Sequence, residues 1–144
     1  MSLIEIMSKQ NTIVRTFNSR DQYHSYDDQP ALVHLCGNKY WMYNDKYHRI
    51  GLPAVIANGY VMYYEHGVLH RDGDLPAVIH KDNEYYYKRG LLHRDNDLPA
   101  VITDKFQYWY KNGMLHRIGE PARIFTLANG KVIVEYWENG EYIK

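Results

Sequence analysis

Two nearly identical stretches of sequence decide the fold, because they return at a fixed distance along the chain. The first reads Leu69-His70-Arg71-Asp72-Gly73-Asp74-Leu75-Pro76-Ala77-Val78-Ile79, and the second reads Leu92-His93-Arg94-Asp95-Asn96-Asp97-Leu98-Pro99-Ala100-Val101-Ile102. Weaker copies occupy residues 23–33, 47–56 and 115–124. All five prolines stand at the same point of the motif, with spacings of 23, 23, 23 and 22 residues: Pro30, Pro53, Pro76, Pro99 and Pro121. A fixed period in the twenties is typical of a repeat array in which each unit packs against its neighbours.

Residues 84–102 show the pattern of a single unit. An aromatic strand (84–87), a Lys-Arg-Gly turn (88–90) and a second strand (91–94) come first. A polar turn (95–97) and an extended segment that begins near Pro99 (98–102) complete the unit, since proline cannot donate to a ladder. No segment shows helical periodicity with caps, so the pattern predicts an all-β chain.

The repeats divide the chain into an N-terminal segment with a half-repeat cap, residues 1–22, and a repeat domain, residues 23–144. For Leu3, Ile4, Ile6 and Met7 we expect a short strand or one helical turn, or else a partly ordered terminus, and from Ile13 to Phe17 a strand of the cap. We place the full units at 23–46, 47–68, 69–91, 92–114 and 115–141. The turn glycines Gly67, Gly90 and Gly113 keep the period, whereas Gly140 follows after 27 residues. A longer hairpin loop is therefore expected around residues 125–131.

Charge and composition exclude several classes of partner. The chain has 144 residues, with 17 basic and 17 acidic side chains, so no charge excess favours a nucleic-acid backbone or an anionic membrane. No run reaches the ~18 apolar residues of a membrane span, and the N-terminus does not resemble a signal peptide. Cys36 is the only cysteine, which excludes an intramolecular disulfide. We expect a cytoplasmic protein without a cofactor.

The hairpin of the fourth unit, Tyr108-Trp109-Tyr110-Lys111-Asn112-Gly113-Met114-Leu115-His116, resembles the MORN family, as does Tyr136-Trp137-Glu138-Asn139-Gly140. The similarity is greatest to the variant form in antitoxin-like bacterial proteins and in phage and giant-virus proteins, and it covers roughly residues 23–144. An arginine follows the histidine where the family has a second glycine. The resemblance implies about five hairpin repeats of ~23 residues, side by side in one elongated, twisted antiparallel sheet.

Stacking the units at a fixed period places aromatic side chains in two columns. Four residues before each turn glycine stand Tyr63, Tyr86, Trp109 and Tyr136, and three residues before it stand Tyr64, Tyr87, Tyr110 and Trp137. Because neighbouring residues of a strand point to opposite faces, we expect one column in the core and the other exposed or half covered. The sequence does not indicate which column faces outward.

Histidine and arginine form two further columns: His48, His70, His93 and His116, and Arg49, Arg71, Arg94 and Arg117. Histidines spread along a sheet cannot converge on one metal ion, so we expect each ring to stack on a neighbour or to bond a turn backbone. We expect the arginines to pair with turn acids: Asp72, Asp74, Asp95, Asp97 and Glu120. The His-Arg-Asp triplets lack the other motifs of a kinase, and the Asp-x-Asp turns lack the ligands of an EF-hand.

The leading hypothesis is a non-enzymatic module that binds another protein through the aromatic columns and through Arg71, Arg94 and Arg117, because Tyr, Trp and Arg dominate binding hot spots. The family resemblance implies an antitoxin, or a phage or viral inhibitor of a host protein. Free sheet edges make a homodimer a further expectation. The alternative is a binder of a small, nucleotide-like ligand in a Tyr/Arg groove or dimer cleft. An enzyme and a plain scaffold are the remaining hypotheses, but no catalytic motif is present.

Overall fold

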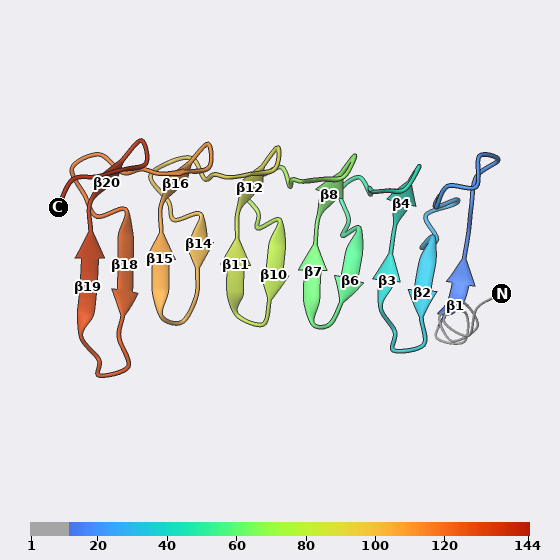
Figure 1. Ribbon diagram of the computed structural model, residues 1–144, viewed down its shortest axis with the longest axis horizontal. Helices are drawn as coiled ribbons and strands as arrows, with labels where there is room; N and C mark the ends of the chain where they lie inside the picture. Colours follow the sequence, from blue (N-terminus) through green and yellow to red (C-terminus); the bar gives the residue numbers. More distant parts are fainter. Residues whose placement is uncertain (1–11) are drawn as a thin grey trace, which may run out of the picture. The chain divides into compact units, whose positions relative to one another are not determined.

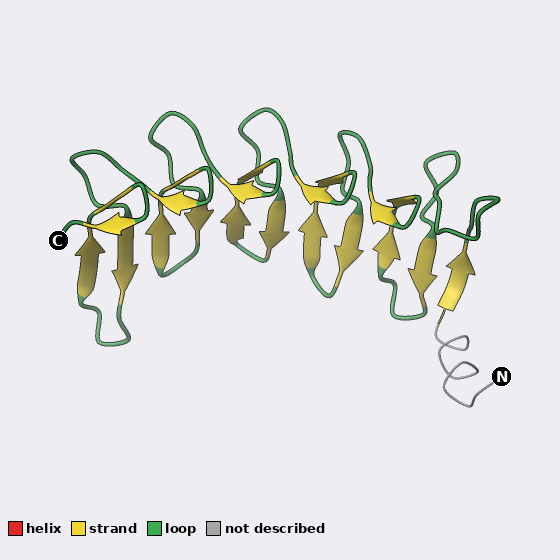
Figure 2. Cartoon of the chain, turned by 45° about the horizontal axis from the view of Figure 1, so that its top comes forward, coloured by secondary structure: helices red, strands yellow, loops and turns green. Residues whose placement is uncertain are grey.

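The computed structural model describes residues 12–144 in two compact units, which meet between Val68 and Leu69. Strands, turns and loops make up all of the described residues (Figure 2), which confirms the predicted all-β class. Between residues 12 and 144 there is accordingly no helix with the length and apolarity that crossing a bilayer requires. The expectation for Leu3, Ile4, Ile6 and Met7 lies outside the described residues.

The N-terminal unit is an antiparallel sheet with one short hairpin beside it. The sheet contains, in spatial order, β1 (Thr12–Arg15), β2 (Leu32–His34), β3 (Lys39–Tyr40), β6 (Val55–Ala57) and β7 (Tyr60–Met62). The short strands β4 (Met42–Tyr43) and β5 (Lys46–Tyr47) pair only with each other. β8 (Tyr64–Glu65) follows β7, and β9 (Val68–Leu69) contains the junction. β1 pairs with β2 through a bulge and confirms the strand expected from Ile13 onward, although it ends at Arg15.

The C-terminal unit repeats the same arrangement three times. Its sheet contains β10 (Val78–His80), β11 (Asn83–Tyr85), β14 (Val101–Ile102), β15 (Phe106–Tyr108), β18 (Arg123–Thr126) and β19 (Val132–Glu135). Separate short hairpins are formed by β12 (Tyr87–Lys88) with β13 (Leu91–Leu92), β16 (Tyr110–Lys111) with β17 (Met114–Leu115), and β20 (Trp137–Glu138) with β21 (Glu141–Tyr142). Each long hairpin is followed by a short one (Figure 1). The longer loop expected near residues 125–131 connects β18 to β19.

Each repeat therefore contains two hairpins, and the single strand predicted for 84–87 is wrong. β11 ends at Tyr85 and β12 begins at Tyr87, because the backbone of Tyr86 bonds in two directions. Its N–H donates to the carbonyl of Ala100 at 2.8 Å, and its carbonyl accepts from the N–H of His93 at 3.0 Å. Tyr86 is thus a corner residue, where the chain leaves the large sheet and enters the short hairpin. Trp109 makes the equivalent bonds to Ala122 and His116.

The core of the C-terminal unit contains the alanines to which these corners bond. Ala77, Ala100 and Ala122 are completely buried, and Val78 and Val101 lie beside two of them in sequence with less than a tenth of their surface exposed. Each alanine donates its N–H to the strand across the hairpin. A larger side chain at such a close-packed position would force the backbone to shift, which costs about 1–3 kcal/mol. The proline before each alanine stands outside the ladder, as its missing N–H predicts.

Candidate functional site

The structure distinguishes the two aromatic columns. In the first column Tyr86 and Trp109 are buried, with 7% and 6% of their surface exposed, and Tyr63 and Tyr136 are half-buried. All four members of the second column are half-buried: Tyr64, Tyr87, Tyr110 and Trp137. Two members of the first column thus enter the core, while its other two members and the whole second column stay half covered. The cause differs from the predicted alternation along a strand, because Tyr86 and Trp109 stand at the corner itself, whereas Tyr87 and Tyr110 begin the short hairpin.

The buried aromatic side chains satisfy their polar atoms locally. Trp109 Nε1 donates to the carbonyl oxygen of Asp97 at 3.0 Å, and the Tyr86 hydroxyl donates to Glu84 Oε2 at 2.8 Å. Burial, together with the Glu84 carboxylate, raises the pKa of Tyr86 to about 12. Such hydrogen bonds allow Trp and Tyr side chains to be buried, because they satisfy the indole N–H and the phenol hydroxyl.

The sequence analysis missed one member of this column. Trp41 in the N-terminal unit is 6% exposed, and its Nε1 donates to the carbonyl of Asp28 at 2.9 Å. Counting back from a turn glycine cannot find it, because Asp45 stands at the position of that glycine. Counting back seven residues from the repeat histidine does find it, since Trp41 precedes His48 by the same distance that separates Tyr86 from His93.

The arginine column joins neighbouring repeats. Arg94 donates from Nε and Nη2 to the two carboxylate oxygens of Asp74, at 2.8 and 3.1 Å, and from Nη1 to the carbonyl of Pro99 at 3.3 Å. Its guanidinium also stacks over the Tyr86 ring, with 3.7 Å from Cζ to the ring centre. Arg117 repeats the arrangement with Asp97, Pro121 and Trp109. Arg49 does so with Asp28, Pro53 and Trp41.

The predicted pairing of arginine with turn acids is confirmed for Asp74 and Asp97, which belong to the preceding repeat. Two of the expected acids have other partners: Asp72 pairs with His70, and Asp95 pairs with His93 and Lys88. Arg117 bonds Asp97 rather than Glu120. Arg71 donates to the carbonyl of Pro76 at 3.2 Å. Because these side chains are engaged within the fold, the arginine column acts first as a structural connection.

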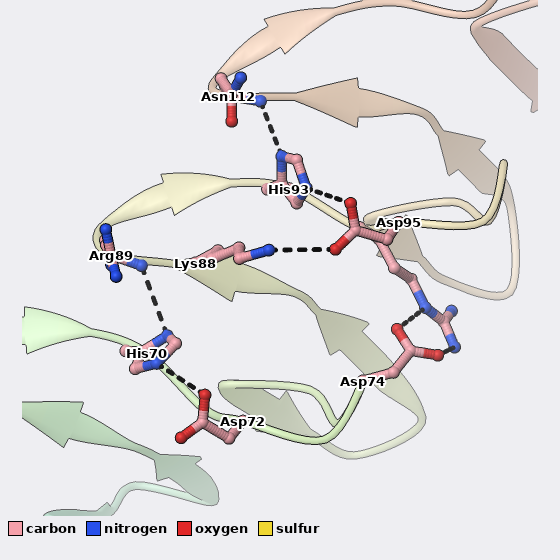
Figure 3. Close-up of polar contacts among 9 residues, drawn as sticks. His70, Asp72, Asp74, Lys88, Arg89, His93, Asp95 and Asn112 are labelled. Atoms are coloured by element: carbon pink, nitrogen blue, oxygen red, sulfur yellow. Dashed lines mark hydrogen bonds and ion pairs between the residues drawn. The ribbon is translucent and has the colours of Figure 1, made fainter.

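The histidine column bonds turn backbones, as predicted. Nδ1 of His93 accepts from the N–H of Asn112 at 3.0 Å, and Nδ1 of His70 accepts from Arg89 at 3.4 Å (Figure 3). Since a backbone N–H can only donate, Nδ1 is unprotonated and the ring proton lies on Nε2. Nε2 of His93 faces Asp95 Oδ1 at 2.9 Å. Residues 12–144 contain no cluster of His, Cys, Asp and Glu that could hold a metal ion.

Four half-buried tyrosines of the C-terminal unit form what we call the tyrosine face: Tyr85, Tyr87, Tyr108 and Tyr110. Burial raises the pKa of Tyr87, and its neighbours Tyr85 and Tyr110 raise it further. Burial also raises the pKa of Tyr110. Tyr85 and Tyr110 therefore lie close enough to Tyr87 to influence its pKa, as Tyr108 does for Tyr110.

Arg123 borders the tyrosine face. It donates to the hydroxyl of Tyr108 at 3.3 Å and to Glu135 at 2.8 Å. Trp137 donates from Nε1 to the same carboxylate at 2.9 Å. In the N-terminal unit, Tyr47 similarly lies between Tyr40 and Tyr64, with ring centres 5.9 and 5.3 Å apart. Half-buried tyrosine rings of this kind can stack against a partner, and their hydroxyl groups can form hydrogen bonds with it.

Comparison with known proteins finds no matching family model, no matching curated protein and no matching solved structure.

Proposed function

We propose that the chain is a non-enzymatic repeat module, MORN-like in type, that binds another protein through its tyrosine face. The observation that carries the proposal is the difference between the two aromatic columns in the C-terminal unit. Tyr86 and Trp109 are buried, whereas Tyr87 and Tyr110 keep part of their surface exposed. Tyrosine and tryptophan supply large contact areas at a low cost in side-chain entropy, which is why they dominate binding hot spots.

The proposal narrows the predicted set of binding residues. Tyr86 and Trp109 are buried. Arg94 and Arg117 connect neighbouring repeats, whereas Arg71 bonds Pro76 within its own repeat. The half-buried rings are Tyr63 and Tyr136 of the first column and the whole second column: Tyr64, Tyr87, Tyr110 and Trp137. A partner can cover these rings and leave the bonds of Arg94 and Arg117 intact. By resemblance, the setting is a cytoplasmic antitoxin, or a phage or viral inhibitor of a host protein.

Binding of a nucleotide-like ligand is the second candidate function, because a Tyr/Arg groove needs arginines that can turn toward the ligand. Arg94 and Arg117 are each held by an aspartate, a proline carbonyl and an aromatic ring. Recruiting either arginine to an anion would require breaking its charge-assisted hydrogen bonds to the aspartate.

The test is an affinity pull-down from host lysate with the Tyr87→Ala/Tyr110→Ala variant. A matched control, Lys105→Ala/Gln107→Ala, changes two exposed residues in and next to β15. Thermal unfolding first establishes that both variants are folded. We expect one stoichiometric protein that wild type and control retain and the tyrosine variant loses. Retention of that protein by a folded Tyr87→Ala/Tyr110→Ala variant would contradict the proposal, and a nucleotide thermal-shift screen would follow.

A further inference from the structure

One repeat of the C-terminal unit shows how the fold binds a carboxylate at its surface. The carboxylate of Asp95 faces His93 Nε2 through Oδ1 at 2.9 Å and Lys88 Nζ through Oδ2 at 3.1 Å (Figure 3). The Asp95 and Lys88 side chains are 62% and 56% exposed, so the pair lies at the surface, whereas the His93 side chain is 8% exposed. We call a histidine Nε2–H and a lysine ammonium in this arrangement a carboxylate clamp.

The next repeat carries the same clamp without the acid. Lys111 and His116 each follow Lys88 and His93 by 23 residues, but Ile118 stands at the position of Asp95. Nδ1 of His116 accepts from the N–H of Asn139 at 3.1 Å, as Nδ1 of His93 accepts from Asn112. This bond holds the ring in the corresponding orientation, with its proton on Nε2. Among residues 12–144, neither His116 Nε2 nor Lys111 Nζ has a carboxylate partner.

The two groups open into a hollow of about 340 Å³, whose lining includes Lys111, His116, Ile118 and Leu98. Ile118 is 75% exposed, like Ile50 at the equivalent position of an earlier repeat, which is 77% exposed, so it offers an apolar surface at the edge of the hollow. The acids that line the same hollow are already paired, since Asp97 binds Arg117 and Asp95 binds His93 and Lys88. Lys111 therefore contributes a positive charge that no described side chain neutralises.

We infer that this hollow binds a carboxylate from outside the chain, held by Lys111 Nζ and His116 Nε2 with its apolar neighbour against Ile118. The class of ligand is an Asp or Glu side chain of a peptide, next to an apolar residue. A small aliphatic carboxylate shares the chemistry and is the second source. The inference does not depend on the tyrosine face, because it rests on a lysine and a histidine whose counterparts in the preceding repeat, Lys88 and His93, bind the carboxylate of Asp95.

The test follows the side-chain nitrogen resonances of His116 by NMR at a constant pH of about 7.5. The probes are the capped peptide acetyl-Leu-Glu-Leu-amide, its isostere acetyl-Leu-Gln-Leu-amide, sodium butyrate and inorganic phosphate. We expect a saturable shift of His116 Nε2 with the glutamate peptide and none with the glutamine peptide. Lys111→Met should weaken binding about tenfold, as the loss of a charge-assisted hydrogen bond does. Lys105→Met, which removes an exposed lysine elsewhere, is the matched control.

A second variant supplies the missing acid within the chain. In Ile118→Asp the new carboxylate should occupy the clamp, shift the His116 resonance without any probe and abolish peptide binding. The unfolding temperature of each variant shows that it is folded. Peptide binding to Ile118→Asp with wild-type affinity, or an equal shift with the glutamine peptide, would overturn the inference. If phosphate bound as tightly as the glutamate peptide, the site would not be specific for carboxylates and the inference would be overturned. If butyrate bound as tightly as the peptide, the ligand would be a small aliphatic carboxylate rather than a peptide side chain.

Discussion

The guanidinium of Arg94 lies over the buried ring of Tyr86, with 3.7 Å between Cζ and the ring centre. The same guanidinium binds Asp74 of the preceding repeat through two hydrogen bonds. One side chain thus covers the corner residue Tyr86 and holds the loop that contains Asp74, both of which belong to the repeat before its own. Arg117 forms the same contacts one repeat later, so the connection recurs along the C-terminal unit.

Replacing Arg94 should destabilise the protein through this connection. We expect Arg94→Ala to lower the free energy of unfolding by about 1–3 kcal/mol, because it removes charge-assisted hydrogen bonds and the cover of a ring. Arg94→Lys should recover only part of the loss, since lysine has no planar fork. Urea unfolding measures both effects, with the exposed Arg89→Ala as the control. Equal unfolding midpoints for Arg94→Ala and Arg89→Ala would contradict the expectation.

Trp109 and Tyr110 are neighbours in sequence and should respond very differently to truncation. Trp109→Ala removes a buried ring and the bond from Nε1 to Asp97, so we expect a loss of about 3–5 kcal/mol. Tyr110→Ala removes a half-buried ring and should cost clearly less. Thermal unfolding of the two single variants provides the comparison. A Tyr110→Ala protein as unstable as Trp109→Ala would place Tyr110 in the core and weaken the proposed binding role.

Stability should fall in mild acid because of His48. Burial lowers the pKa of His48, and the neighbouring His66 lowers it further, while Glu65 acts in the opposite direction. Its Nδ1 accepts from the N–H of His66 at 3.1 Å, a bond that only the neutral ring can make. The unfolded chain therefore takes up its proton first, at the ordinary pKa of 6.5. The contribution is complete above that pH and is lost as the pH falls toward the lower pKa of the folded state.

The measurement is the urea midpoint between about pH 8 and pH 5 for wild type and His48→Gln. Glutamine offers an acceptor that does not titrate, so the variant should lose less stability across this range. Parallel curves for the two proteins would show that His48 makes no such contribution.

Alanine substitutions at two turn glycines distinguish the cost of backbone strain from the cost of side-chain crowding. Gly113 and Gly119 have φ of +82° and +73°, so alanine costs about 1 kcal/mol at either position. A Cβ on Gly113 would lie 3.3 Å from Leu91 Cδ2, whereas one on Gly119 would meet no atom within 4 Å. We therefore expect Gly113→Ala to be the more destabilising of the two in thermal unfolding. The reverse order would show that Leu91 yields to the added methyl group.

Much of the architecture could be predicted from local sequence, for reasons visible in single residues. The turn residues Gly90 and Gly113 adopt positive φ, as their position in the repeat requires. Pro99 precedes its strand because it lacks an N–H. The histidine column bonds turn backbones, as expected from rings that are spread along an array and cannot converge.

The period, the turns and the all-β class could be predicted because they follow from backbone preferences that act within a few residues, and the aromatic, histidine and arginine columns follow from the period. The position at which each repeat turns its corner depends instead on tertiary contacts. Tyr86 enters the core and Tyr87 stays half covered because Ala100 of the next repeat accepts the N–H of Tyr86. The pairing of Arg94 with Asp74 likewise joins residues 20 apart in the sequence. Such contacts depend on how one repeat is laid against the next, and no pattern within a single repeat contains that information.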